Sequence, residues 1–296
     1  MLIDKTIPLR YIFSNVKADL SVSLVFILVV ILIKYFLPEL NLNIAIPALL
    51  GTAISLVLAF KLSQSYDRWW EARKIWGEIV NDSRTLINQI QGFSHKNITS
   101  NEDIESFAFR QIAWCYALAY SLRNLNPLDI ISKFLSKTEL EALQGQVNIP
   151  LKLMNNHNKQ LNKLLKEESI NEFQQIQIDK TLVRMVASMG KAERIKNTVF
   201  PRTYRIFLRF FIYLFILTLA IALDNLNPMY EIGLLLLIAF PFFLLKSTAQ
   251  HMQDPFENRP TDTAMLTISK TIEINLKQLI NKEISQPEEK ETFFKM

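Results

Sequence analysis

Residues 49–84 read LLGTAISLVLAFKLSQSYDRWWEARKIWGEIVNDSR, a stretch that begins apolar and ends densely charged. Its first part, up to Phe60, is apolar enough to lie in a lipid bilayer. The part after Phe60 carries three tryptophans and a dense mixture of both charges. No proline or glycine lies where the character changes. The pattern therefore predicts one continuous helix that leaves a membrane and enters water.

Composition narrows the classes of protein to consider. The chain has 296 residues, 50% of them hydrophobic and only 6 of them glycine, which favours long helices and an all-α fold. The single cysteine, Cys115, excludes an intramolecular disulfide, and His95, His157 and His251 lack the spacing of metal ligands. We expect no catalytic residues, no metal site, no cofactor and no enzyme activity. The net charge of +5 is spread along the chain, so no nucleic acid partner is expected.

Four apolar segments approach the length of about 20 residues that a membrane-spanning helix needs. They form two pairs, residues 20–37 with 44–60 and residues 206–223 with 232–245. Lys34 and Arg209 stand near segment ends, where we expect long cationic side chains to reach the lipid headgroups. The sequence thus predicts an integral membrane protein with two transmembrane hairpins.

The loops predict the orientation of these hairpins. Residues 38–43 and 224–231 contain no lysine or arginine, and they carry the acids Glu39, Asp224 and Glu231. Cationic flanks such as Arg73 and Lys196 lie on the other side of the apolar segments. Because positive charge stays inside, we expect a multi-pass protein of the cell membrane with both termini in the cytoplasm.

The predicted domain organisation follows from these spans. It comprises a cytoplasmic N-terminal segment (1–19), transmembrane hairpin 1 (20–61), a cytoplasmic helical domain (62–204), transmembrane hairpin 2 (205–246) and a cytoplasmic C-terminal segment with a disordered end (247–296). Within the helical domain, Ser136 or Thr138 is a candidate N-cap, and Glu141 would complete a capping box with Thr138.

Two rows of residues follow the second apolar segment at a spacing of four. One row is small (Gly51, Ser55, Ala59, Ser63), and the adjacent row contains Thr52, Leu56, Phe60 and Gln64. Small rows let helices approach closely in membranes. Two interpretations stay open: ordinary packing within one subunit, or an axial space surrounded by several copies of this helix.

The run DRWWEARK (67–74), joined to the apolar segment before it, resembles the bestrophin family of pentameric ion channels. ERIKNTVFP (193–201) and DPF (254–256) agree with it, as does the order of two spans, a long helical domain and two spans. The resemblance covers nearly the whole chain. It implies a homopentameric ring around one axial pore, membrane lipids as surroundings, and small monovalent ions, chiefly chloride, as the permeant species.

The resemblance also implies site residues. A neck in the membrane falls at Thr52, Leu56 and Phe60, and hydrophobic rings of this kind gate by dewetting. Thr52 departs from the family, which commonly places bulky apolar residues at all three levels. A second, cytoplasmic aperture falls near Phe173 and Ile176, although a core position for Phe173 is an alternative. We assign Asp67, Arg68, Trp69 and Trp70 to subunit assembly.

Ion selectivity stays open at the level of sequence. The electropositive ring edges of Phe60 would attract anions, whereas Asp224 and Glu231 would favour cations if they lined the pore mouth. A sodium-selective channel of the same fold is therefore an alternative. Calcium control is not expected, because animal bestrophins carry an acidic run where this chain has only Glu257 and Asp262 after Phe256.

Two other classes of function remain as alternatives. A membrane-anchored scaffold would have the same spans without a pore. A secondary transporter would have discontinuous helices, for which Pro47 and Pro241 are candidate breaks, and ionisable groups at the membrane midplane.

Overall fold

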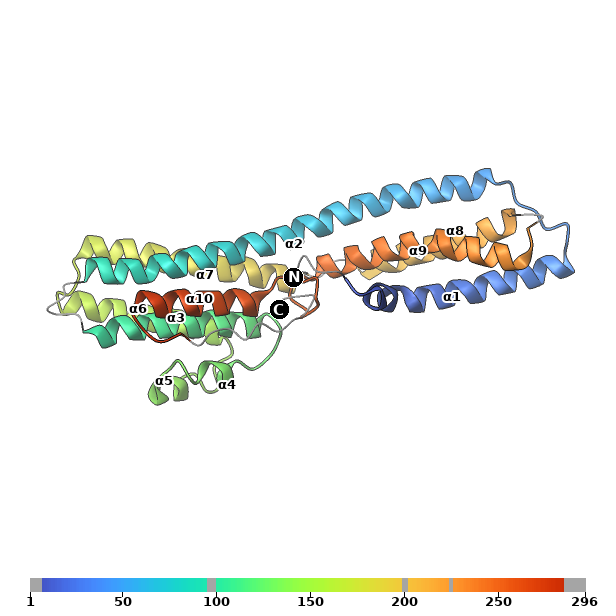
Figure 1. Cartoon of the computed structure of the whole chain (residues 1–296). Helices are drawn as coiled ribbons and strands as arrows, with labels where there is room; N and C mark the ends of the chain where they lie inside the picture. Colours follow the sequence, from blue (N-terminus) through green and yellow to red (C-terminus); the bar gives the residue numbers. More distant parts are fainter. Residues whose placement is uncertain (1–6, 95–99, 199–201, 224–225, 285–296) are drawn as a thin grey trace. The chain divides into compact units, whose positions relative to one another are not determined.

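The computed structural model describes residues 7–94, 100–198, 202–223 and 226–284 (Figure 1). Within these ranges all regular secondary structure is helical, so the predicted all-α class is confirmed. The chain divides into two compact units. We call residues 4–69 and 199–253 the membrane unit, and residues 1–3, 70–198 and 254–296 the helical unit.

The described helices are α1 (Leu9–Phe36), α2 (Ala45–Phe93), α3 (Asn101–Ser121), α4 (Leu128–Ile131), α5 (Lys137–Glu141), α6 (Ile149–Lys166), α7 (Glu172–Asn197), α8 (Arg202–Ala222), α9 (Pro228–Gln253) and α10 (Met265–Leu279). Four of them, α1, α2, α8 and α9, are long and apolar enough to cross a membrane, as predicted.

Helix α2 is unbroken over 49 residues and belongs to both units. The predicted domain boundary between residues 61 and 62 lies inside it and stays a prediction. Pro47 falls in the first turn of α2, where its missing N–H has no helical partner to lose. Pro241 lies inside α9, yet α9 continues to Gln253. Pro47 and Pro241, the candidate breaks of a transporter, therefore do not interrupt these helices.

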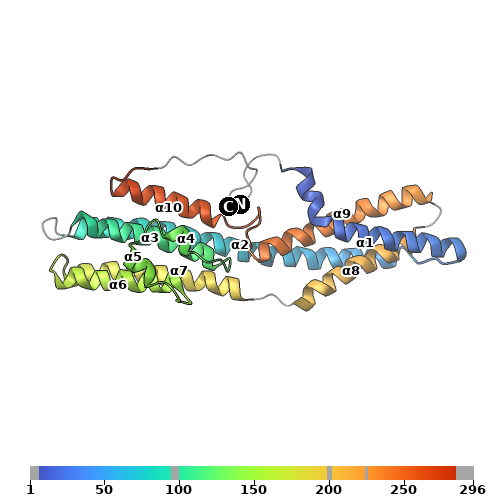
Figure 2. The ribbon, with the colours of Figure 1, turned by 90° about the horizontal axis from the view of Figure 1, so that it is seen from below.

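In the membrane unit, α1, α8 and α9 pack directly on one another (Figure 2). Their shared core contains Ile27 of α1, Ile212 of α8 and Phe243 of α9, all fully buried. Helix α2 meets α8 through Gly51, where an added Cβ would lie 3.0 Å from Cε2 of Phe215. At Gly51, the small residue therefore serves packing within one chain.

Two buried ion pairs join the helices of the membrane unit. Asp19 of α1 accepts a hydrogen bond from Nζ of Lys246 of α9 at 2.6 Å and one from the Tyr213 hydroxyl of α8 at 2.9 Å. Arg209 also lies 3.3 Å from Asp19, although half of its side chain is exposed. Because lipid offers no water to these groups, each charge needs a protein partner.

The second pair corrects a prediction about Lys34. Its Nζ lies 3.2 Å from Oε1 of Glu231 and donates to the backbone oxygens of Ala220 and Leu223. These oxygens are at the end of α8, where carbonyls lack helical partners and the helix dipole favours a cation. Lys34 therefore links α1, α8 and α9 and does not reach outward to the headgroups.

The helical unit has an apolar core formed by the C-terminal half of α2 and by α3, α6, α7 and α10. Trp76, Phe107, Trp114, Met185 and Ile272 are among its fully buried residues. Ion pairs between α2 and α7 lie at its surface. They are Glu71–Arg194 at 2.8 Å, Glu78–Lys191 at 3.0 Å and Asp82–Arg184 at 2.8 Å.

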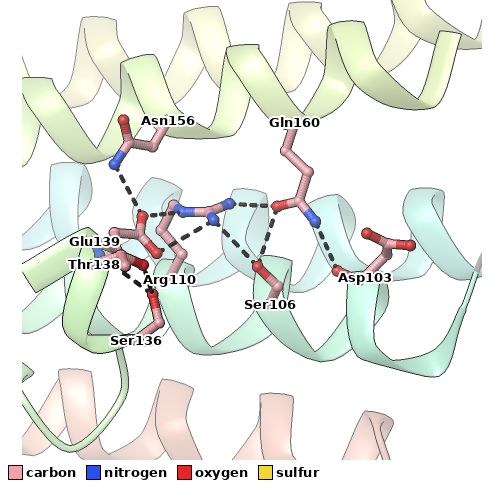
Figure 3. Close-up of polar contacts among 8 residues, drawn as sticks. All are labelled: Asp103, Ser106, Arg110, Ser136, Thr138, Glu139, Asn156 and Gln160. Carbon is pink, nitrogen blue, oxygen red and sulfur yellow. Dashed lines mark hydrogen bonds and ion pairs between the residues drawn. The ribbon is translucent and has the colours of Figure 1, made fainter. Parts of the chain in front are cut away.

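A polar network attaches α5 to α3 and α6 (Figure 3). The guanidinium of Arg110 donates to both carboxylate oxygens of Glu139 and to Gln160, and Asn156 donates to Glu139 at 3.0 Å. The side chain of Ser136 caps α5 by accepting the Glu139 N–H at 3.3 Å.

This cap corrects the predicted capping box of Thr138 and Glu141. The N-cap is Ser136, and α5 ends at Glu141. A capping box does occur at the start of α7, where Asn171 and Gln174 bond each other's backbone N–H groups.

Candidate ion pathway

The membrane half of α2 has one packed face and one uncovered face. Ile54 and Leu58 are buried in the core of the membrane unit. The predicted neck residues occupy the other face: Thr52 is exposed, Leu56 is 59% exposed and Phe60 is 62% exposed. The structure of one chain therefore places all three on the same uncovered row, as the spacing predicted. Whether this row lines a pore stays a prediction.

Polar residues accompany these neck residues on the uncovered face. Ser55, Ser63 and Gln64 are exposed there as well. The hydroxyl of Thr52 donates to the carbonyl of Ala48 at 2.9 Å, and that of Ser55 donates to the carbonyl of Gly51 at 2.8 Å. Since the hydroxyl protons are used within the helix, the oxygens present acceptor lone pairs outward.

The exposed face of α1 has a different composition. Its exposed residues between Val22 and Leu32 are apolar without exception: Val22, Val25, Phe26, Leu28, Val29 and Leu32. An apolar face of this kind suits contact with lipid tails. The uncovered face of α2, with its hydroxyls and an amide, does not suit that contact as well.

The predicted assembly residues lie about two to three turns beyond Phe60 along α2. Asp67 is exposed, Arg68 is half-buried, and the Trp69 ring lies 6.0 Å from the Tyr66 ring. Trp70 is half exposed, whereas Trp76 is fully buried in the helical unit. Of these three tryptophans, only Trp76 is fully buried in the core of its own chain. The assembly role of the other residues stays a prediction.

The predicted aperture residues lie in the first two turns of α7. Phe173 is 84% exposed and Ile176 is 51% exposed, and both follow the capping box that begins this helix. The alternative that Phe173 belongs to the core is therefore wrong for a single chain. Large apolar side chains exposed in a part of the chain that lies outside the four spans indicate a contact or function that one chain does not satisfy.

Of the two acids considered for a pore mouth, the structure describes only Glu231. Glu231 is buried and paired with Lys34, so it is not available to attract cations. Asp224 lies outside the described residues.

The segment after α9 contains the two acids considered for calcium. Glu257 accepts a hydrogen bond from Lys196 at 2.7 Å, and Asp262 accepts the N–H of Arg259 at 3.0 Å. Burial raises the pKa of Asp262 to about 6. In the described parts of the chain, no group of three or more His, Cys, Asp or Glu side chains is placed to hold a metal ion. The absence of calcium control stays a prediction.

Comparison with known proteins covers almost the whole chain. Residues 9–278 match the model of the family described as bacterial/fungal bestrophin protein. A voltage-dependent anion channel-forming protein of Ralstonia nicotianae is 28% identical over 244 residues, which cover 81% of this chain and 78% of that protein. The voltage-dependent anion channel-forming protein YneE of Escherichia coli is 25% identical over 274 residues, covering 90% of this chain and 88% of that protein.

Solved structures show the same fold. The crystal structure of a bacterial bestrophin homologue from Klebsiella pneumoniae superposes with a TM-score of 0.82 at 23% sequence identity. The match covers 91% of this chain and 100% of that chain.

Proposed function

Because the chain belongs to the bacterial and fungal bestrophin family, we propose that it is a pore-forming ion channel in which five copies surround one axis. The membrane half of α2 lines the pore in this proposal. The resemblance of residues 67–74 to pentameric bestrophins supports the number of copies, and the names of the relatives from Ralstonia and Escherichia support the channel function.

The uncovered face of α2 is the observation that carries the proposal. Thr52, Ser55, Ser63 and Gln64 lie on it beside Leu56 and Phe60, while the exposed residues of α1 between Val22 and Leu32 are all apolar. A helix that faced lipid would gain nothing from these polar groups. A helix that faced an axial aqueous space would keep them hydrated.

Leu56 and Phe60 form the hydrophobic neck in this proposal. They are four residues apart, so five copies of each make two apolar rings about 6 Å apart along α2. An ion that passes these rings loses part of its water and finds no polar group to replace it. Thr52 offers oxygen at its own level, which leaves the main barrier to Leu56 and Phe60. Phe173 and Ile176 on α7 form the second aperture.

We propose small monovalent anions of the chloride type as the permeant ions. The ring edges of Phe60 are electropositive, and the relatives are named as anion channel-forming proteins. A sodium-selective channel is the second candidate. It is favoured by the acceptor oxygens that Thr52 and Ser55 present, because acceptors suit cations.

The location and the regulation complete the proposal. The protein lies in the cell membrane with both termini in the cytoplasm, since lysine and arginine are missing from residues 38–43 and 224–231. Calcium does not control the channel, because Glu257 and Asp262 already bond groups of their own chain. Ion flux into liposomes should therefore be the same with and without a calcium chelator, and flux that requires micromolar calcium would contradict this.

The neck is tested by the double variant Leu56→Ala, Phe60→Ala in liposomes that contain chloride or sodium. We expect flux to rise several-fold, because the rings widen and expel less water, and the preference for chloride to weaken. The matched control is Leu28→Ala, Leu32→Ala, which removes the same kind of surface from the lipid-facing side of α1. Unchanged flux in the α2 variant would overturn the neck.

The assembly is tested separately with a cysteine at Leu56. Cross-linking through an axial cysteine should give covalent dimers, because each thiol forms one bond, and the intact complex in mild detergent should have the mass of five chains. A mass of one or two chains in mild detergent would overturn the ring and would favour the membrane-anchored scaffold.

A further inference from the structure

An apolar groove of about 300 Å³ lies between α2 and α8 in the membrane unit. Leu50, Ile54 and Val57 line it from α2, and Phe207, Leu208 and Phe211 line it from α8. These residues recur every three or four positions on both helices, so the groove follows the direction of the two helices. Its volume and its apolar lining suit a hydrocarbon chain.

Cationic residues lie just beyond one end of this groove. Tyr204 lines that end, and Nζ of Lys61 lies 5.5 Å from the centre of the Tyr204 ring. Lys61 stands one turn beyond Val57 on the same face of α2 and is only 2% exposed. Among the described residues, no carboxylate and no hydrogen-bond acceptor is found within bonding distance of Lys61.

Further positive charge surrounds Lys61. Arg205, next to Tyr204 on α8, and Lys246 on α9 both repel its ammonium group. Lys246 is paired with Asp19, but Lys61 and Arg205 have no such carboxylate in the described part of the membrane unit. The first turn of α8, which begins at Arg202, adds the positive end of a helix dipole. A buried lysine in this field is stabilised by an anion.

We propose that this groove binds an anionic phospholipid, with one acyl chain against Ile54, Val57 and Phe207 and the phosphate at Lys61 and Arg205. The apolar lining and the cationic end together match the two parts of such a lipid. In the orientation proposed above, the cationic end faces the cytoplasmic leaflet, where anionic lipids attract lysine and arginine. The site does not depend on ion flow, so it stands apart from the proposed channel function.

A second copy of the chain is the main competing occupant. It would need an acid to neutralise Lys61, and Asp67 is the exposed carboxylate nearest in sequence to that end of α2. Asp19 and Glu231, by contrast, are paired inside their own chain. The phospholipid supplies both the charge and the hydrocarbon in one molecule, which favours it over a helix with a single acid.

The test uses the purified full-length protein, stripped of lipid in a neutral detergent. Phosphatidylglycerol and phosphatidylcholine are titrated separately, and bound lipid per chain is counted by native mass spectrometry. We expect one phosphatidylglycerol per chain to bind at least about fivefold more tightly than phosphatidylcholine, the factor that one cation near an anionic group supplies. Lys61→Met should remove this preference while keeping the volume of the side chain. Ala53→Phe, which fills the groove, should weaken both lipids.

Lys17→Gln is the matched control, because Lys17 is an exposed cation of the same unit on α1. It should bind both lipids as the wild type does. Equal preference for phosphatidylglycerol in wild type and Lys61→Met would overturn the proposal. So would equally tight binding of free glycerol phosphate, which has no acyl chain. Dissociation of the oligomer by Ala53→Phe or Asp67→Asn, with lipid binding unchanged, would assign the groove to a second copy instead.

Discussion

The ion pairs of the membrane unit differ in exposure from those between α2 and α7 in the helical unit. In the membrane unit, Asp19 pairs with Lys246 and Glu231 pairs with Lys34 where little or no surface is exposed. In the helical unit, the pairs between α2 and α7 lie at the surface, with about half of each basic side chain exposed. Lipid cannot solvate a charge, whereas water can.

This difference indicates where each unit depends most on single residues. A buried charge without its partner is costly, so the membrane unit should be sensitive to its few ion pairs. Exposed pairs contribute little, so the helical unit should depend less on its pairs between α2 and α7 than on apolar side chains such as Trp76 and Trp114. Helix α2 passes through both environments, and substitutions along it should separate the two cases.

The largest effect is expected for Asp19→Asn. The change leaves the ammonium of Lys246 without its carboxylate in a buried position, which should lower the free energy of unfolding by about 4 kcal/mol. Denaturant titration in detergent micelles, followed by the helical circular dichroism signal, measures it.

Glu78→Gln is the control for this comparison, because it breaks an exposed pair with Lys191 and should cost less than about 0.5 kcal/mol. The double change Asp19→Leu, Lys246→Met removes both buried charges and should recover most of the loss. Equal losses for Asp19→Asn and Glu78→Gln would mean that the contrast between the two units is wrong.

A second large effect is expected within α2 itself. Trp76→Ala opens a cavity in the core of the helical unit and should lower the free energy of unfolding by about 3 kcal/mol. Phe60→Ala removes an exposed side chain of the same helix and should cost less than about 1 kcal/mol. The same titration compares them, and a larger loss for Phe60→Ala would show that a second chain buries Phe60 in the assembled protein.

His157 of the helical unit is a titratable group that is fully buried and stacked on Phe107. Burial, and then the charge of Arg110, hold its pKa well below the ordinary value of 6.5. Below pH 6.5 the unfolded chain therefore binds a proton that the folded chain does not bind. This contribution to stability is complete above pH 6.5 and is lost as the pH falls.

The pH test compares wild type with His157→Leu. Between pH 6.5 and pH 5, the wild type should lose about 2 kcal/mol more than the variant, at about 1.4 kcal/mol for each pH unit. Other groups, including Asp262, titrate in both proteins and cancel in the difference. Parallel pH profiles for the two proteins would mean that His157 is charged in the folded state.

Sequence predicts features whose cause is local. The four spans follow from apolar length, and the continuity of α2 follows from the lack of a proline or glycine near Phe60. The shared uncovered row of Thr52, Leu56 and Phe60 follows from helical spacing.

Features that depend on distant partners could not be predicted. Lys34 has its acid 197 positions away in Glu231, so sequence favoured the lipid headgroups instead. The groove beside Lys61 depends on the pairing of α2 with α8 and has no local signal. Ser136 and Thr138 are both good caps, so the sequence left the choice between them open, and the structure has Ser136 as the N-cap of α5.

The smallest effect is expected for maleimide labelling of Cys115 in the native protein. This labelling tests whether the core of the helical unit opens. Its thiol is fully buried beside Ser83 and Gln111, and burial raises its pKa to about 12. The reactive thiolate is therefore scarce and shielded at neutral pH.

A maleimide should not label the native wild type but should label one site per chain in dodecyl sulfate. The control is Val147→Cys, since Val147 is fully exposed in the same unit and its cysteine should react at once. Labelling of native wild type at a comparable rate would show that the helical unit opens. If Cys115 is not labelled, the cross-linking experiment with a cysteine at Leu56 can keep Cys115, because any product then comes from the introduced cysteine alone.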